Sequence, residues 1–287
     1  MHHQQQRSST VSSASTSAME DWREEAINRG SLKRVDLHTG SNGWAAPPGE
    51  LFSVRGPNYL NKKGKSQAGE WLLDPAGVDW IRSNDKLEHA LARRDNRIMN
   101  ALRRSKKSSK TFLVAVNLQI PGREHHSVVS YFSSKAGEPI NSNSLLYKFI
   151  NGSDAYRDSR FKLVNKIVKG PRILKTAVGS YSACLLGKAV NCSYYRGPNY
   201  LEIDVDIGSS AVATTILRLA LGCVKAVTVD MGFLVEGQTE EELPEKLFGA
   251  VRICHMEMSS ATFVDVTAAT PISNKVFPVD SDDDDEH

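Results

Sequence analysis

The chain has 287 residues, of which 40% are hydrophobic and 24% are charged, and its formal net charge is +3 at pH 7. This composition is typical of a globular protein with one large domain or two small ones. The most apolar stretch, residues 211–235, contains Arg218, Lys225 and Asp230 and is interrupted by Gly222, so the sequence excludes a transmembrane helix.

The spacing of apolar residues predicts the helices and strands in chain order. We predict a short helix over 20–28, a loop over 40–49, a strand over 51–55, a helix over 85–104, a strand over 111–120 with its hairpin partner over 127–132, short helices over 145–150 and 155–160, a strand over 161–168, a helical turn over 173–178, two long strands of which the second covers 201–207, a buried helix over 211–221, a strand over 225–236, a short acidic helix over 240–248 and a last strand over 251–258.

Strands joined by hairpins, with helices grouped between them, indicate an α+β fold. We expect a curved, mainly antiparallel sheet packed against helices that cover one of its faces. A sheet folded around the helix over 211–221 would resemble the helix-grip shape of START domains. That analogy concerns the fold alone and implies no function.

Residues 44–266 are expected to form a single globular domain between two disordered tails. Residues 1–18 are rich in Ser, Thr and Gln and contain no acid, which is typical of a disordered segment; a plastid transit peptide is the alternative. Residues 267–287 are polar and end in DSDDDDE, which predicts a solvated acidic tail.

The cysteines indicate a reducing compartment. None of the four belongs to a CxxC pair or has a histidine at zinc-ligand spacing, which argues against a disulfide framework and a zinc site. They are Cys184, Cys192, Cys223 and Cys254. Since all four lie in apolar segments, we expect buried free thiols and an intracellular location, cytoplasmic or peripheral to a membrane, with the nucleus and the plastid as alternatives.

The hexapeptide RGPNYL occurs twice, beginning at Arg55 and at Arg196. Pro followed by Asn suits the centre of a tight turn, so recurrent turn chemistry explains the repeat. A functional interpretation is that Arg55 and Arg196 reach one anionic ligand; the alternative is that each is solvated or paired with an acid. Ser209 and Ser210 open the helix over 211–221, where they either cap it or offer an anion site at its N-terminus.

Residues 201–207 alternate strictly between apolar and acidic residues, which predicts a strand with one apolar and one acidic face. The acidic side chains are those of Glu202, Asp204 and Asp206. We expect this acidic stripe to face solvent or to pair with Lys188, Arg196 or Arg218. If the stripe pointed into the domain, burial would demand partners, and a metal site or acid–base chemistry would become a hypothesis.

A basic run of eight positive charges within residues 93–110 contains one acid, Asp95. Its last part includes Arg103, Arg104, Lys106 and Lys107, which are candidates for binding an anionic membrane surface or for a nuclear signal. A solvated helix end is the alternative. No aromatic residue interrupts the run, which argues against single-stranded nucleic acid as a partner.

Five blocks of this sequence stand in a family's order: VRGPNYL from Val54, NLQIPG from Asn117, DAYRDSRFKLVNKIVKGP from Asp154, CLLGKAVNCSYYRGPNYLEIDVDIGSS from Cys184 and ELPEKLFGAVRI from Glu242. Together they resemble the C-terminal domain of the plant Enhanced Disease Resistance Two proteins. The resemblance implies a link to the control of plant defence and cell death. Larger members carry a pleckstrin-homology and a START domain before this module. Since only 43 residues precede Trp44, we expect neither domain here.

The resemblance supplies no catalytic residues, and the sequence contains no GxSxG, GxGxxG or Walker motif. We therefore expect a non-enzymatic regulatory or binding domain without a cofactor or a bound metal. Its expected ligand is a lipid or an anionic headgroup. The alternative is a protein-interaction module that binds protein partners and no small ligand. A further alternative is a hydrolase that uses the acidic stripe.

Overall fold

The computed structural model describes residues 22–105, 110–135, 138–179 and 181–268. The tails predicted to be disordered fall outside these ranges except for residues 267 and 268, and so do Lys106 and Lys107 of the basic run.

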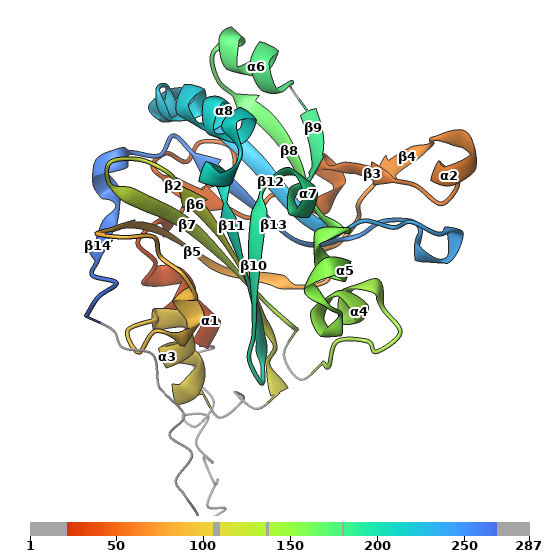
Figure 1. Ribbon diagram of the computed structural model, residues 1–287, viewed down its shortest axis with the longest axis horizontal. Helices are drawn as coiled ribbons and strands as arrows, with labels where there is room; N and C mark the ends of the chain where they lie inside the picture. Colours follow the sequence, from red (N-terminus) through yellow and green to blue (C-terminus); the bar gives the residue numbers. More distant parts are fainter. Residues whose placement is uncertain (1–21, 106–109, 136–137, 180, 269–287) are drawn as a thin grey trace, which may run out of the picture.

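Two six-stranded sheets form the body of the protein (Figure 1). The first sheet has the order β1 (Lys33–Arg34), β2 (Gly43–Ala45), β13 (Leu247–Cys254), β12 (Thr228–Val235), β8 (Phe161–Lys169) and β9 (Tyr181–Leu185). The second has the order β10 (Asn191–Arg196), β11 (Tyr200–Asp206), β6 (Leu113–Ile120), β7 (His125–Ser133), β5 (Asp74–Ser83) and β14 (Thr262–Val264). A separate hairpin joins β3 (Ser53–Arg55) to β4 (Lys65–Gln67).

Most neighbouring strands run antiparallel; β1 with β2, β11 with β6 and β14 with β5 are the parallel pairs. The α+β class and the mainly antiparallel pairing are thus confirmed. The sequence suggested one sheet, whereas the structure has two that pack face to face. The chain passes from the edge of the first sheet to the edge of the second between β9 and β10.

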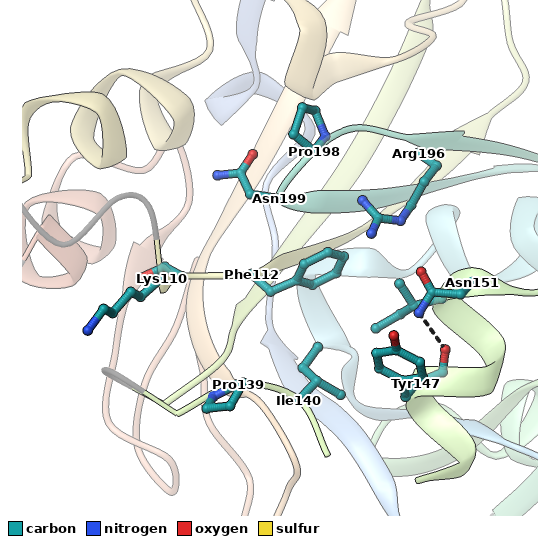
Figure 2. Close-up of a pocket in the computed structure, with 11 residues that line it drawn as sticks. Lys110, Phe112, Pro139, Ile140, Tyr147, Asn151, Arg196, Pro198 and Asn199 are labelled. Atoms are coloured by element: carbon teal, nitrogen blue, oxygen red, sulfur yellow. Dashed lines mark hydrogen bonds between the residues drawn. The ribbon is translucent and has the colours of Figure 1, made fainter. Parts of the chain in front are cut away.

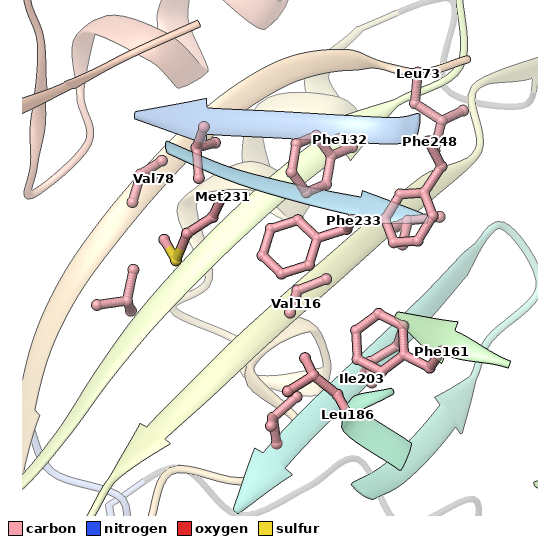
Figure 3. Packing of buried hydrophobic residues seen from close by; sticks show 14 of the residues in the cluster. Leu73, Val78, Val116, Phe132, Phe161, Leu186, Ile203, Met231, Phe233 and Phe248 are labelled. Carbon is pink, nitrogen blue, oxygen red and sulfur yellow. The ribbon is translucent and has the colours of Figure 1, made fainter. Parts of the chain in front are cut away.

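The main hydrophobic core lies between the two sheets. Its centre is aromatic: Phe132 of the second sheet meets Phe233 and Phe248 of the first, with ring centroids 5.9 and 6.0 Å apart, and Phe161 extends the cluster (Figure 3). Each such side chain stabilises the fold by about 1.5–3 kcal/mol through burial. Alternation in the strands places these residues on the inner face of each sheet.

Helices cover the outside and the ends of this sandwich. They are α1 (Trp22–Asn28), α2 (Tyr59–Lys62), α3 (Arg97–Arg104), α4 (Leu145–Asn151), α5 (Asp154–Asp158), α6 (Arg172–Val178), α7 (Leu186–Ala189) and α8 (Ala211–Leu221). Helices α1 and α3 pack on the outer face of the second sheet through a second apolar cluster that includes Trp22 and Leu102. The packed body therefore begins before residue 44. Within the described residues, no helix is both long and apolar enough to cross a membrane.

Helix α8 has the predicted bounds but not the predicted burial. None of its residues is buried, and Val212 is 71% exposed. Ala213, Leu217 and Leu221 pack against the edge of the main core, so α8 covers one end of the sandwich and is not gripped by a sheet (Figure 1). The expectation of a buried helix was wrong. Side chains of the two sheets pack against each other and form the core, so no inner sheet face is left to cover α8.

Three other predicted elements differ from the structure. The helix predicted over 85–104 is helical only in α3 and in a short 3-10 turn at Ala90–Ala92. The loop predicted over 40–49 contains β2, which pairs with β13. The acidic helix predicted over 240–248 is reduced to a 3-10 turn at Glu240–Glu242, because β13 already begins at Leu247.

Candidate functional site

A pocket of about 590 Å³ lies beside α4, at the end of the sandwich opposite to α6 and α8 (Figures 1 and 2). We call it the α4 pocket. Its lining comes from the segment before β6, the loop before α4, α4 itself and the turn between β10 and β11. The lining residues are Lys110, Thr111, Phe112, Pro139, Ile140, Tyr147, Ile150, Asn151, Arg196, Pro198 and Asn199.

Helix α4 is fixed by its cap and its apolar face. The Ser144 hydroxyl accepts a hydrogen bond from the Tyr147 amide at 3.1 Å, which is an N-cap interaction. Phe149 and Ile150 are buried and anchor the helix. Tyr147 and Asn151, one turn apart, therefore share the side that lines the pocket, and the Asn151 amide donates to the Tyr147 carbonyl at 3.0 Å (Figure 2).

The opposite wall is the second copy of RGPNYL. The Gly197 amide donates to the Tyr200 carbonyl at 3.0 Å and closes the turn between β10 and β11. The Arg196 guanidinium lies over the Phe112 ring, 4.9 Å from its centroid, and donates to the Tyr200 carbonyl at 3.3 Å. Burial and the nearby Arg157 guanidinium lower the pKa of Arg196, yet an arginine remains charged throughout the physiological range.

The lining of the α4 pocket combines cationic, neutral polar and apolar side chains. Arg196 and Lys110 carry its charges, and none of the described residues that line it is acidic. Within the described residues, Arg196 has no carboxylate partner, and the Tyr147 hydroxyl and the Asn199 side chain make no hydrogen bond. Guanidinium, hydroxyl and amide donors are the groups that hydrogen-bond to anions, and the apolar side chains beside them can contact hydrocarbon.

The first copy of RGPNYL has a different environment. Arg55 pairs with Glu236 at 2.9 Å, lies 3.8 Å from Glu245 and stacks over Tyr59. Lys162 joins the same buried network through Glu245 at 2.9 Å. Arg55 and Arg196 therefore line different pockets, and the structure does not bring them to one ligand.

The two serines before α8 are engaged in local structure. The Ser210 hydroxyl caps α8 by accepting from the Ala213 amide at 3.3 Å. The Ser209 hydroxyl accepts from the Asn191 amide at 2.8 Å and donates to the Asp206 carbonyl at 2.7 Å. They lie at the end of the β10–β11 hairpin away from Arg196, so they are not part of the α4 pocket.

Glu202 and Asp204 of the acidic stripe do not face solvent, which corrects the sequence-based expectation. The Glu202 carboxylate is fully buried and accepts from the Ala90 and Leu91 amides at 2.6 and 2.8 Å. Asp204, 2% exposed, accepts from the His89 amide at 2.9 Å and from Asn117 at 3.1 Å. The segment before α3 covers this face of the sheet. The backbone amides of residues 89–91 donate to the Glu202 and Asp204 carboxylates, so they do not form the hydrogen bonds of a helix.

Burial and the Asp204 carboxyl raise the pKa of Glu202 well above its usual range. Burial likewise raises the pKa of Asp204 to about 6. Asp206 is only partly buried and pairs with Lys86 at 2.7 Å, not with Lys188, Arg196 or Arg218. The buried pair thus holds a loop in place, and its carboxylates have no access to a substrate.

The described parts of the chain contain no group of three or more His, Cys, Asp or Glu side chains that could hold a metal ion. All four cysteines are free thiols, as expected, although only Cys254 is fully buried. Burial raises the pKa of Cys192 to about 12, so this thiol is a poor nucleophile at neutral pH.

Three of the six cations of the basic run that the structure describes pair with acids. Arg93 pairs with Asp95 and Arg97 with Asp79, each at 2.8 Å, and Arg104 pairs with Glu25. Arg103 is exposed and bonds to Asn100 at 3.1 Å, whereas Lys106 and Lys107 lie outside the described residues. Acids distant in sequence supply two of these partners, so the run alone could not reveal the pairing.

Sequence reasoning found Arg196 but missed the rest of the α4 pocket. Phe112, Ile140 and Tyr147 come from three segments that meet only in the fold. The signal that could have pointed to Tyr147 and Asn151 is their spacing of four residues in a helix whose other positions, apart from Lys148, are apolar.

Comparison with known proteins identifies the family. Residues 44–257 match the family described as "Protein ENHANCED DISEASE RESISTANCE 2, C-terminal". The chain belongs to this family. It is 43% identical over 232 residues to an Arabidopsis thaliana protein named "Protein ENHANCED DISEASE RESISTANCE 2-like", a match that covers 81% of this chain and 31% of that protein. No solved structure matches this chain. The resemblance inferred from the sequence blocks is thus confirmed.

Proposed function

We propose that this chain is a non-enzymatic binding domain whose α4 pocket takes an amphipathic anion, with chemistry like that of a phospholipid headgroup and its first acyl carbons. The observation that carries the proposal is Arg196: a guanidinium on an aromatic ring, in the lining of a partly apolar pocket that contains no acid among the described residues. Arginine recognises phosphate and carboxylate through paired hydrogen bonds, and the Nε and Nη2 groups of Arg196 have no partner within the described residues.

The other lining groups support the same ligand chemistry. The Lys110 ammonium adds a second positive charge, and the Tyr147 hydroxyl and Asn199 side chain offer neutral hydrogen bonds. Phe112, Ile140 and Ile150 supply apolar lining that suits the hydrocarbon adjoining a headgroup. A volume of about 590 Å³ is in the range of small-ligand sites.

The alternative function, a hydrolase that uses the acidic stripe, lacks accessible catalytic carboxylates at Glu202 and Asp204. Glu202 and Asp204 are closed off from solvent and saturated with backbone amides and side-chain amides. A general acid or base must come within hydrogen-bond reach of its substrate. Asp206, the accessible member of the stripe, is held by Lys86.

Family membership supports a regulatory role in plant disease resistance. Because the match spans 31% of the Arabidopsis protein, the activity of that whole protein is not carried over. We propose that this domain contributes to such regulation by binding or releasing a ligand in the α4 pocket.

The test is titration of the full chain with three soluble ligands: inorganic phosphate, a short-chain phosphatidic acid below its micelle concentration, and the matching short-chain phosphatidylcholine. Nuclear magnetic resonance shifts or calorimetry would report binding. We expect the phosphatidic acid to bind, with the Arg196→Gln variant at least tenfold weaker, since one lost charged hydrogen bond costs about 1.5–3 kcal/mol. Arg103→Gln is the matched control, because Arg103 is also exposed but lies on α3.

The outcomes separate the ligand sources. Binding of inorganic phosphate as strong as that of phosphatidic acid would identify a soluble phosphate as the ligand. Binding of phosphatidic acid alone would favour a lipid. If no anion binds, or if Arg196→Gln binds as well as the wild type, the proposal fails and the protein-interaction module becomes the better interpretation.

A further inference from the structure

The end of the sandwich formed by α6 and α8 exposes aliphatic side chains. Among the large hydrophobic residues that the structure describes, Val212 of α8 and Ile173 of α6 are the most exposed, at 71% and 65%. Both helices lie together at this end, away from the α4 pocket (Figure 1). Where exposed apolar side chains belong to one contiguous surface, that surface often marks an interaction site.

The two helices form one continuous surface. Leu174 of α6 packs with Leu219 and Ala220 of α8 over Ile167 and Val227. With 3.6 residues per turn, Val212, Ile216 and Leu219 share one side of α8, so an apolar stripe runs from the contact with α6 to the exposed Val212. We call this surface the α6–α8 face.

The charge of the α6–α8 face has one sign. Residues 166–178 and 207–229 contain no acid, and they contain Lys166, Lys169, Arg172, Lys175, Arg218 and Lys225. Within the described residues none of these six side chains makes an ion pair; Lys169 bonds to the His38 carbonyl at 3.4 Å. Asp230, which follows the second segment, is buried and paired with Arg252.

We propose that the α6–α8 face docks on an anionic lipid bilayer, with Ile173 and Val212 entering the headgroup region and the surrounding cations meeting the lipid phosphates. Amphipathic helices bind membranes in this way, through buried aliphatic side chains and attraction to anionic lipids. Charge complementarity favours this occupant over a second copy of the chain, because a symmetric dimer through this face would bring like charges such as Arg172 and Arg218 together.

This proposal goes beyond the proposed function, since it concerns a different surface. A bilayer in contact with the α6–α8 face leaves the α4 pocket at the far end of the molecule (Figure 1). The two sites can therefore be tested apart, and either can fail while the other holds.

The test is co-sedimentation of the full chain with phosphatidylcholine vesicles prepared with and without phosphatidylserine, at low and high salt. We expect binding that requires phosphatidylserine and weakens with salt. The triple variant Arg172→Gln/Arg218→Gln/Lys225→Gln should partition about a hundredfold less, because each basic residue at an anionic surface contributes about fivefold. The double variant Ile173→Ser/Val212→Ser should also bind less, since it loses its apolar insertion.

Two matched controls keep the test specific. Phe263→Ser removes another exposed hydrophobic side chain, on β14, and Arg103→Gln removes an exposed cation on α3. Both should bind vesicles like the wild type. All the substituted side chains are exposed, so each variant should keep the wild-type melting temperature.

Three results would overturn the proposal. Vesicle binding without need for phosphatidylserine is one, and wild-type binding by both the triple and the double variant is another. The third is a concentration-dependent dimer, seen by analytical ultracentrifugation, that Ile173→Ser/Val212→Ser abolishes, because the face would then be occupied by a second copy of the chain.

Discussion

The two copies of RGPNYL have the same six residues and different roles. Each arginine ends a strand, β3 for Arg55 and β10 for Arg196, and each glycine that follows donates to a backbone carbonyl nearby. After the turn the copies separate: Tyr59 begins a short helix, whereas Tyr200 begins β11.

The neighbours of each arginine decide the difference. Glu236, just after β12, and Glu245, just before β13, enclose the first guanidinium, and Lys162 shares both acids. The second guanidinium faces the α4 pocket and no acid. A local motif thus specifies a turn, and segments distant in the chain specify whether its arginine is enclosed by acids or lines a pocket without them.

The largest expected effect comes from breaking the first copy. Arg55→Gln should destabilise the protein by about 3 kcal/mol, near the low end for breaking a buried ion pair because the side chain is 22% exposed. Arg196→Gln should change the unfolding free energy by no more than about 0.5 kcal/mol. Urea denaturation of the two variants measures both values. Equal losses would mean that the two arginines do not differ in structural role.

A second prediction concerns Asp204, whose carboxyl group is buried beside Glu202 and several amide groups and pairs with no cation among the described residues. Burial raises the pKa of Asp204 to about 6, whereas an unfolded aspartate titrates near pH 4. Between these values the folded chain holds a proton that the unfolded chain has released, so stability falls as pH rises through this window. The shift corresponds to about 2–3 kcal/mol.

Thermal melting between pH 4 and 7 tests this prediction. The wild type should lose stability relative to an Asp204→Asn variant as the pH rises, because the variant has no proton to release at that position. Parallel melting curves for the two proteins across this range would show that the buried pair does not titrate there.

Strand β11 shows how much of the fold could be predicted from the sequence. Alternation in residues 201–207 predicted β11, and the inward burial of Leu201, Ile203 and Val205 fits the predicted apolar face. Alternation defines two faces but does not say what covers each one. Glu202 and Asp204 were expected in water because the loop that buries them lies more than a hundred residues earlier.

For helix α8, the sequence predicted the bounds correctly and the burial wrongly. Its bounds follow from local signals, namely the Ser210 cap and Gly222 at its end. Its apolar composition predicted burial, yet burial depends on whether another element covers the helix, and here the sheets cover each other. For the site, Arg196 could be singled out from its motif, whereas Phe112 and Tyr147 become neighbours only when the second sheet and α4 assemble.

A third prediction gives the arginine of the second copy an acidic neighbour, as the arginine of the first copy already has. Asn151→Asp places a carboxylate on the side of α4 that faces Arg196 across the pocket (Figure 2). An anionic ligand must then compete with this acid, so the affinity for short-chain phosphatidic acid should fall about tenfold, or about 1.4 kcal/mol. Calorimetry measures the change, and Asn143→Asp, an exposed site in the loop before α4, is the control. Unaltered affinity in Asn151→Asp would place the anion away from Arg196.

The smallest expected effect concerns the rings beneath the two arginines. Phe112 lies 4.9 Å from the Arg196 guanidinium, and Tyr59 lies 4.7 Å from that of Arg55. A cation–π contact at a partly exposed site contributes about 0.5–1 kcal/mol. In the second copy the ring and two carbonyls are all that orient the guanidinium, so Phe112→Leu should weaken anion binding by about two- to fivefold. In the first copy Glu236 and Glu245 hold Arg55 without the ring, so Tyr59→Leu should leave anion binding unchanged. Titration of both variants with phosphatidic acid compares the copies directly, and an equal loss in the two would mean that the Phe112 ring does not orient Arg196 for its ligand.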